Sequence, residues 1–133
     1  MAELSENARK KIEEPNFGYL ATVMEDGSPQ VSPVWVDLEN GYVVVNTAMG
    51  RVKERNVRRD PRVAISVADR ENQYDKIDVR GRVVDMIEGD EAEQHIDKMA
   101  KKYLGQDTYP WKAADERRVL LKIEPESVSE MRD

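Results

Sequence analysis

Short segments with apolar residues at every second position, separated by tight-turn dipeptides, constrain the fold of this chain more than any other feature. Residues 17–24 show this alternation, which is the period of a strand with one buried face. Asp26-Gly27 follows this segment and Asn40-Gly41 follows the next, and both dipeptides favour hairpin turns. We therefore predict an antiparallel meander in the first half of the chain. Its strands are residues 17–24, 29–37 and 42–46.

The second half of the chain continues the strand pattern and adds helices. Gly81 lies in the middle of a long alternating segment and predicts a β-bulge there. Asp90 and Glu93 have the spacing of a capping box, and Gly105 suits the end of the helix that they open. The predicted strands are residues 62–67, 76–86 and 117–128, and the predicted helices of the whole chain are residues 4–14, 52–59 and 90–104.

Six turn-linked strands with few helices predict a mainly β fold, a small six-stranded antiparallel barrel with peripheral helices outside it. No repeat, low-complexity stretch or linker divides the 133 residues, so we predict one domain. Within it, residues 1–15 form an N-terminal helix, residues 16–128 form the barrel and residues 129–133 form a tail.

Composition excludes several classes of function. The chain has no cysteine and one histidine, which argues against disulfides, a thiolate or multi-histidine metal site, and a Ser-His-Asp triad. Its net charge of −6 argues against general nucleic-acid binding. No apolar run is long enough to cross a membrane, and no signal peptide is visible at the start. We therefore expect a cytoplasmic protein without membrane or nucleic-acid partners.

Pro33 lies inside the second predicted strand and admits two interpretations. Proline cannot donate a backbone hydrogen bond, so it occurs on edge strands, at bulges or where strand pairing is interrupted. Pro33 therefore marks either an edge strand or a strand whose outer face is open to a flat ligand.

The clearest functional signal is a cluster of basic residues. Residues 51–62 carry six Lys or Arg against two acidic residues, a net charge of +4 in an acidic chain. The cluster begins at the predicted start of a helix, where free N–H groups and the helix dipole favour an anion. We interpret Arg51, Lys53, the Thr47 hydroxyl and nearby backbone amides as a phosphate site. The alternative is a solvated helix that forms ion pairs with the acidic remainder.

The aromatic residues support the same ligand interpretation. Trp35 ends the strand that contains Pro33, and Tyr109 and Trp111 lie in a later loop. These side chains serve either as core residues and loop anchors or as a stacking surface for a planar ring. His95 is expected to be a partly exposed surface residue without a role. The basic pairs Lys101-Lys102 and Arg117-Arg118 are expected on solvated faces, although one of the two arginines is able to reach a ligand groove. A metal site is not expected at the acidic residues Glu88, Asp90, Glu91 and Glu93.

Four segments, taken in order, resemble the pyridoxamine-phosphate-oxidase-like split β-barrel superfamily. They are DGSPQVSPVWVD, VNTAMGRVKERNVRRDPRVAISV, VRGRVV and HIDKMAKKYLGQDTYPW. Within the superfamily they are similar to the branch of deazaflavin (coenzyme F-420) dependent oxidoreductases. The resemblance implies a homodimer of split barrels with a flavin-type ring in each of two clefts between the subunits. The segment EPESVSEMRD lacks the arginine-containing substrate motif of the pyridoxamine-phosphate oxidases, which disfavours that activity.

The resemblance also implies which residues bind the cofactor, FMN or coenzyme F-420. The ring would face residues 31–35, and the path to the phosphate would begin at Asn46 and Thr47. Arg51 and Lys53 would hold the phosphate. The full implied set is Val31, Ser32, Pro33, Val34, Trp35, Asn46, Thr47, Arg51, Val52, Lys53, Tyr74 and Lys76.

These observations lead to a hypothesis of an oxidoreductase that transfers a hydride between the cofactor and a small unsaturated or oxidised substrate. The cofactor ring supplies the redox chemistry, so no dedicated catalytic side chain and no metal are expected. The alternative is a non-catalytic carrier of a flavin or tetrapyrrole. Nucleic-acid binding is disfavoured, because residues 51–62 contain no aromatic side chain on which bases would stack.

Overall fold

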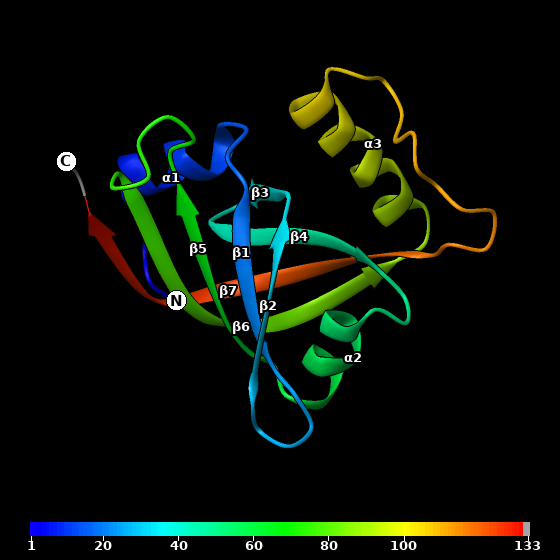
Figure 1. Ribbon diagram of the computed structural model, residues 1–133, viewed down its shortest axis with the longest axis horizontal. Helices are drawn as coiled ribbons and strands as arrows, with labels where there is room; N and C mark the ends of the chain where they lie inside the picture. Colours follow the sequence, from blue (N-terminus) through cyan, green and yellow to red (C-terminus); the bar gives the residue numbers. More distant parts are fainter. Residues whose placement is uncertain (132–133) are drawn as a thin grey trace.

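The computed structural model describes residues 1–131, which contain three helices and seven strands (Figure 1). The helices are α1 (Glu6–Glu13), α2 (Val52–Arg59) and α3 (Asp90–Leu104). The strands are β1 (Gly18–Val23), β2 (Pro29–Val34), β3 (Val36–Glu39), β4 (Tyr42–Ala48), β5 (Arg62–Ala68), β6 (Lys76–Glu88) and β7 (Arg118–Met131). The mainly β, antiparallel prediction is confirmed.

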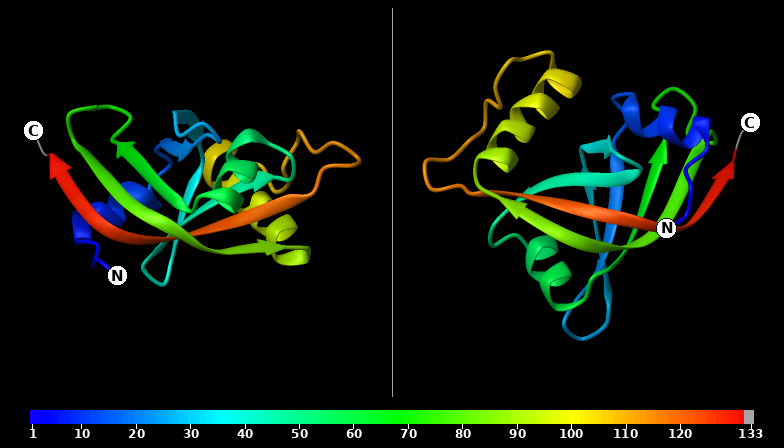
Figure 2. Two further views of the ribbon diagram at one scale, coloured as in Figure 1. Left: turned by 90° about the horizontal axis from the view of Figure 1, so that it is seen from below. Right: turned by 180° about the vertical axis from the view of Figure 1, so that it is seen from behind.

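The strands form one antiparallel sheet in the order β2-β1-β5-β6-β7-β4-β3. Its two edge strands, β2 and β3, are consecutive in the chain and are separated by Trp35 alone. Trp35 thus connects the two edge strands, and the sheet curls into a barrel (Figure 1 and Figure 2). The hydrogen bonding between neighbouring strands is interrupted between β2 and β3. The prediction of six strands was wrong because the single strand expected at residues 29–37 is divided by this break.

The inward-facing residues of the sheet form one apolar core. Val43 and Val45 on β4 meet Leu121 and Ile123 on the paired strand β7. Ile12 of α1 and Val57 of α2 join the same core, and the two helices lie at opposite ends of the curled sheet (Figure 1). Helix α3 lies on the outer face instead, where a smaller cluster forms from Val44, Ala92 and Leu120. In residues 1–131 no helix is long and apolar enough to cross a bilayer.

The predicted turns and the predicted bulge occur where the residue types demand them. Asn40 and Gly41 have φ values of 52° and 83°, the left-handed conformation of a tight hairpin turn. The register between β6 and β7 shifts at Gly81, which confirms the bulge. A Cβ atom at Gly81 would overlap the carbonyl oxygen of Glu124, so only glycine allows this close approach.

Helix α2 has the predicted bounds, and α3 ends as predicted at Gly105, whose φ is 72°. The predicted capping box of α3 is wrong, because the N-cap is Gly89 and no side chain caps it. Glu93 instead accepts a hydrogen bond from the backbone N–H of Arg118 at 2.9 Å. Strand β7 continues to Met131, three residues past the predicted end of the last strand.

Candidate functional site

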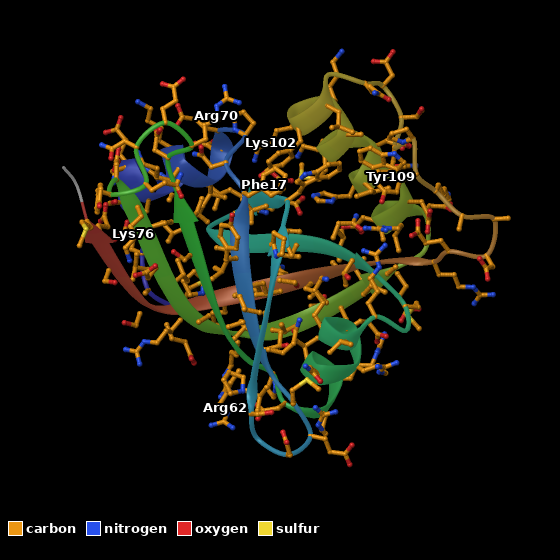
Figure 3. The ribbon with its side chains drawn as sticks, in the orientation of Figure 1. Phe17, Arg62, Arg70, Lys76, Lys102 and Tyr109 are labelled. Atoms are coloured by element: carbon orange, nitrogen blue, oxygen red, sulfur yellow. The ribbon has the colours of Figure 1, made fainter. Side chains whose placement is uncertain are left out.

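A cavity of about 150 Å³ lies beside the break between β2 and β3. It is bounded by that break, the N-terminus of α2, one face of α3 and the loop that follows α3. Figure 3 labels two of its lining residues, Phe17 before β1 and Tyr109 beside α3. The lining residues are Phe17, Pro33, Val34, Trp35, Asn46, Arg51, Lys53, Ile96, Tyr109, Trp111 and Arg118.

One wall of the cavity is aromatic. Trp35 stacks on Tyr103 with ring centroids 5.1 Å apart and planes 6° from parallel. Tyr109 makes an edge contact with Trp35 at 6.1 Å, and Trp111 lies 6.4 Å from the same ring. Trp111 itself is 62% exposed. Trp35 is therefore half-buried by its aromatic neighbours and also borders the cavity, so both interpretations of this residue hold in part.

Side chains from α3 replace the missing ladder at the strand break. The Tyr103 hydroxyl accepts from the N–H of Val36 at 3.0 Å and donates to the carbonyl of Asn16 at 2.7 Å. Lys102 Nζ donates to the carbonyls of Ile12 and Val36, each at 2.6 Å. Burial raises the pKa of Tyr103 to about 12 and lowers that of Lys102 to about 8. The expectation that Lys102 lies on a solvated face was therefore wrong.

The opposite side of the cavity is cationic. Arg51, Lys53 and Arg118 all border it, and Arg118 is only 3% exposed. Burial, followed by the charges of Arg51 and Arg118, lowers the pKa of Lys53. Burial also lowers the pKa of Arg118, against the opposing effect of Glu116. These shifts indicate that Lys53 and Arg118 are partly desolvated and that both lie close enough to Arg51 to be repelled by its charge.

Glu116 is a carboxylate that lies close to two of these cations. Its Oε1 atom lies 3.3 Å from Arg51 Nη2 and 3.1 Å from Arg118 Nη1. The contact with Nη1 lacks hydrogen-bond geometry, so this buried donor has no hydrogen-bond partner. Glu116 thus pairs with two of the three cations, and the group keeps a net positive charge that is suited to an anion.

The start of α2 adds to this positive potential. Arg51 is the N-cap, and its side chain makes no capping hydrogen bond. The carboxylate of Glu54 accepts from the N–H of Gly50 at 2.7 Å. The first amide groups of a helix have no intrahelical acceptor, and the helix dipole is positive there. The start of α2 lies where the sequence predicted it, and the phosphate-site interpretation of Arg51 and Lys53 stays a prediction.

Behind Arg118 lies a buried chain of polar side chains. Arg118 Nε donates to Asn46 Oδ1 at 2.9 Å, and Asn46 Nδ2 lies 3.1 Å from His95 Nδ1. His95 Nε2 lies 2.9 Å from Asp37 Oδ2. Burial opposes ionisation of Asp37, yet hydrogen bonds from His95 and Lys98 lower its pKa to about 2. His95 is only 7% exposed, so its predicted surface position was wrong.

Asp37, Glu39 and His95 also have the spacing of a possible metal site. Lys98 Nζ lies 3.1 Å from Asp37 Oδ2, the same oxygen that contacts His95. An ammonium group in this position competes with any cation for the carboxylate. The cluster is thus an ion-paired network, and we assign it no metal.

The structure brings six of the predicted cofactor residues to the cavity. They are Pro33, Val34, Trp35, Asn46, Arg51 and Lys53. Pro33 lies on an edge strand and also borders the cavity, so its two interpretations are compatible. Of the pair Arg117-Arg118, it is Arg118 that borders the cavity, in line with the expectation that one arginine reaches a ligand groove. The expectation that Arg118 lies on a solvated face was wrong, because it is buried.

Six other predicted residues lie elsewhere within the described chain. Thr47 is fully buried on the face of β4 opposite Asn46, because successive side chains of a strand alternate. Tyr74 is 69% exposed in the loop before β6, and Lys76 pairs with Asp78 far from Tyr109 in Figure 3. The remaining three are Val31 and Val52, which are exposed, and Ser32, which is half-buried.

The predicted set omitted five lining residues. Phe17 and Ile96 gave no signal, because an apolar residue at strand or helix spacing normally indicates core. Tyr109, Trp111 and Arg118 did give a signal in the aromatic loop and the basic pair, although the sequence did not show that they meet. These omitted residues are Phe17, Ile96, Tyr109, Trp111 and Arg118.

Comparisons with known proteins agree with this architecture. The family model described as "Pyridoxamine 5'-phosphate oxidase" matches residues 4–132. A solved F-420 reductase is 31% identical with a TM-score of 0.83, over 95% of this chain and 98% of that chain. General Stress Protein 26 from Bacillus anthracis is 21% identical with a TM-score of 0.71, over 95% and 92% of the two chains. A putative pyridoxamine 5'-phosphate oxidase from Listeria innocua is 18% identical with a TM-score of 0.69, over 91% and 92%.

The last two likenesses bear on the fold alone, whereas the family match spans almost the whole chain. The interrupted antiparallel sheet, the three helices and this match lead to one assignment. The chain belongs to the pyridoxamine 5'-phosphate oxidase family and has its split-barrel fold.

Proposed function

We propose that this protein is an oxidoreductase that transfers a hydride between FMN or coenzyme F-420 and a small unsaturated or oxidised organic substrate. The observation that carries the proposal is the pairing of an aromatic wall with three cations in one cavity. A flat ring that bears a phosphate has the complementary chemistry. Membership of the family and the similarity to an F-420 reductase support the same proposal.

The residues divide the work of binding. We expect Arg51, Lys53 and Arg118, which all border the cavity, to hold the phosphate through charge-assisted hydrogen bonds. Trp35 and Pro33 offer the apolar surface for the ring. The bound cofactor supplies the hydride chemistry, while the protein holds the ring, neutralises the phosphate and restricts water. No side chain needs to form a covalent bond with the substrate.

The size of the cavity favours a site that is completed by a second copy of the chain. Small-molecule sites span about 300–1,000 Å³, whereas this cavity measures about 150 Å³. Near it, Phe17, Tyr19 and Val31 are 49%, 50% and 63% exposed. Exposed apolar surface of this kind is typical of a protein interface. We propose a homodimer in which this surface is covered and Tyr74 and Lys76 of the second copy approach the ring.

Cofactor binding tests the proposal directly. Purified protein is titrated with FMN and with coenzyme F-420, and binding of either in the low micromolar range is expected. Failure of both to bind would refute the proposed function. Where one binds, its reduced form is mixed with candidate acceptors and its oxidation is followed by absorbance. Binding without any acceptor-dependent oxidation would instead indicate the non-catalytic carrier.

A further inference from the structure

We propose that Asp37, His95 and Asn46 form a hydrogen-bonded chain that orients the guanidinium of Arg118 toward the anionic group of the ligand. His95 is then a positioning residue, which acts on the ligand only through Asn46 and Arg118. The inference rests on the proposed function, since it requires an anion in the cavity. The four residues come from β3, α3, β4 and β7.

The orientation of the Asn46 amide is fixed by two partners whose roles are unambiguous. Its Nδ2 atom lies 3.0 Å from the carbonyl oxygen of Ala92, which only accepts. Its Oδ1 atom lies 2.9 Å from Arg118 Nε, which only donates. A flipped amide would place oxygen against oxygen at one end and donor against donor at the other. The amide therefore has a single satisfactory orientation.

This orientation determines the state of the His95 ring. Asn46 Nδ2 also lies 3.1 Å from His95 Nδ1. Because Nδ2 donates, Nδ1 must accept and carries no proton. The remaining nitrogen, Nε2, then carries the proton and donates it to Asp37 Oδ2 at 2.9 Å. We assign His95 as the neutral ring protonated on Nε2.

Asp37 anchors the far end of the chain. Its Oδ1 atom accepts from the N–H of Leu38 at 2.8 Å, and Lys98 Nζ lies 3.1 Å from its Oδ2 atom. Asp37 is 8% exposed, so its carboxylate is largely shielded from water. The anchored carboxylate holds His95, His95 holds the amide of Asn46, and the amide holds Nε of Arg118.

Of the two side-chain hydrogen bonds that Arg118 forms with the described residues, the one from Nε to Asn46 is the shorter, so Asn46 is its principal support. Nη2 makes a long contact of 3.4 Å with the Asn46 carbonyl oxygen, and the guanidinium lies 5.2 Å from the Tyr109 ring centre. Glu116 pairs with Nη1 without forming a hydrogen bond. Within the described chain, Nη1 is thus a donor without a hydrogen-bond partner on a residue that borders the cavity, and a ligand oxygen would supply that partner.

The single histidine makes the assigned ring state directly measurable. Two-bond ¹H–¹⁵N NMR spectra of the folded wild-type protein at neutral pH should show protonated Nε2 and bare Nδ1. Asn46→Asp replaces the Nδ2 donor by an oxygen, so its histidine should become protonated on both nitrogens. A wild-type ring with its proton on Nδ1 would overturn the proposed chain.

Ligand binding then separates positioning from a general structural role. FMN and riboflavin share the ring, and only FMN carries the phosphate. His95→Phe keeps a planar ring but removes both nitrogens, and it should weaken FMN binding about tenfold while riboflavin binding changes less than about twofold. His95→Gln retains a donor and an acceptor and should recover most of the loss. Gln94→Ala, an exposed neighbour on α3, is the matched control.

Equal weakening of both flavins, or an unchanged preference for FMN, would overturn the positioning role. If His95→Phe does not fold, the preference for FMN over riboflavin is measured with Asn46→Asp instead, and this preference should be partly lost. Pyrophosphate, followed by the fluorescence of the two tryptophans, separates this inference from the proposed function. If wild type binds pyrophosphate but neither flavin nor coenzyme F-420, the proposed function fails. A tenfold weaker affinity of His95→Phe for pyrophosphate would then still support the hydrogen-bonded chain from Asp37 to Arg118. Absence of binding to all of these probes would overturn both.

Discussion

Replacement of Lys53 by methionine should separate ligand binding from folding at the cationic side of the cavity. Lys53 is half-buried, and burial together with Arg51 and Arg118 lowers its pKa. Its positive charge is therefore unfavourable in the empty protein, whereas an anion in the cavity would offset the repulsion. We expect Lys53→Met to bind FMN more weakly and to be at least as stable as wild type.

The expected loss of binding is the value of one charge-assisted hydrogen bond to the phosphate. Such a bond contributes about 1.5–3 kcal/mol, which corresponds to a rise in Kd of about 10- to 150-fold. The stability effect has the opposite sign. A lysine with a lowered pKa binds fewer protons in the folded state than in the unfolded state, so wild-type stability increases as the pH rises through the folded-state pKa toward the ordinary value. Methionine has no charge and removes this dependence.

Titration with FMN gives the Kd, and urea unfolding at neutral and alkaline pH gives the free energy of unfolding. Lys10→Met is the matched control, because Lys10 is exposed on α1, which contributes no residue to the cavity. It should leave both quantities unchanged. Undiminished FMN affinity in Lys53→Met, or a large loss of its stability, would refute the binding role of this residue.

Three further substitutions test other parts of the structure. Glu116→Gln removes the carboxylate that faces Arg51 and Arg118, so FMN affinity measured by the same titration should rise about fivefold. A fall in FMN affinity would contradict this expectation and would mean that Glu116 contributes to ligand binding. Gly81→Ala places a Cβ atom against the backbone of Glu124 and should lower the free energy of unfolding in urea by about 3 kcal/mol; an unchanged value would contradict the close approach. The pKa of Asp37 is lowered to about 2, so the free energy of unfolding of wild type should fall by about 2 kcal/mol as the pH falls from about 4 to about 2. Urea unfolding of Asp37→Asn over the same pH range should not show this loss. If both proteins lose stability equally with acid, the pairing of Asp37 with His95 and Lys98 is contradicted.

Local sequence signals predicted those parts of the fold that depend on neighbouring residues. Helix α2 has the predicted bounds, the Asn40-Gly41 turn is present, and the bulge lies at Gly81. Each depends on backbone preferences that a few residues determine. Pro33 indicated an edge strand or interrupted pairing, but no local signal predicted that the strand divides at Trp35. The unpaired backbone groups at this break are satisfied by Tyr103, which lies far along the chain.

For the candidate site too, the sequence predicted what depends on neighbouring residues and not what depends on tertiary packing. Arg51 and Lys53 were predicted because their charges and the start of α2 are visible in sequence. The role of His95 was not predicted, since a polar residue beside apolar Ile96 is typical of an exposed helix position. Its burial results from the packing of α3 on β3 and β4, where Asp37 and Asn46 provide partners. Such tertiary complementarity has no signature in the order of residues along one helix.

The central position of β7 has a consequence for how the protein folds during synthesis. Among the described strands, β7 is the one that pairs with both β4 and β6, and these pairs join residues far apart in sequence, such as Val44 and Lys122. Before β7 leaves the ribosome, the hairpin of β3 and β4 has no hydrogen-bonded connection to the remaining strands. Its buried valines, Val43 and Val45, would then stay accessible to chaperones. Completion of the sheet therefore waits for the last strand to emerge.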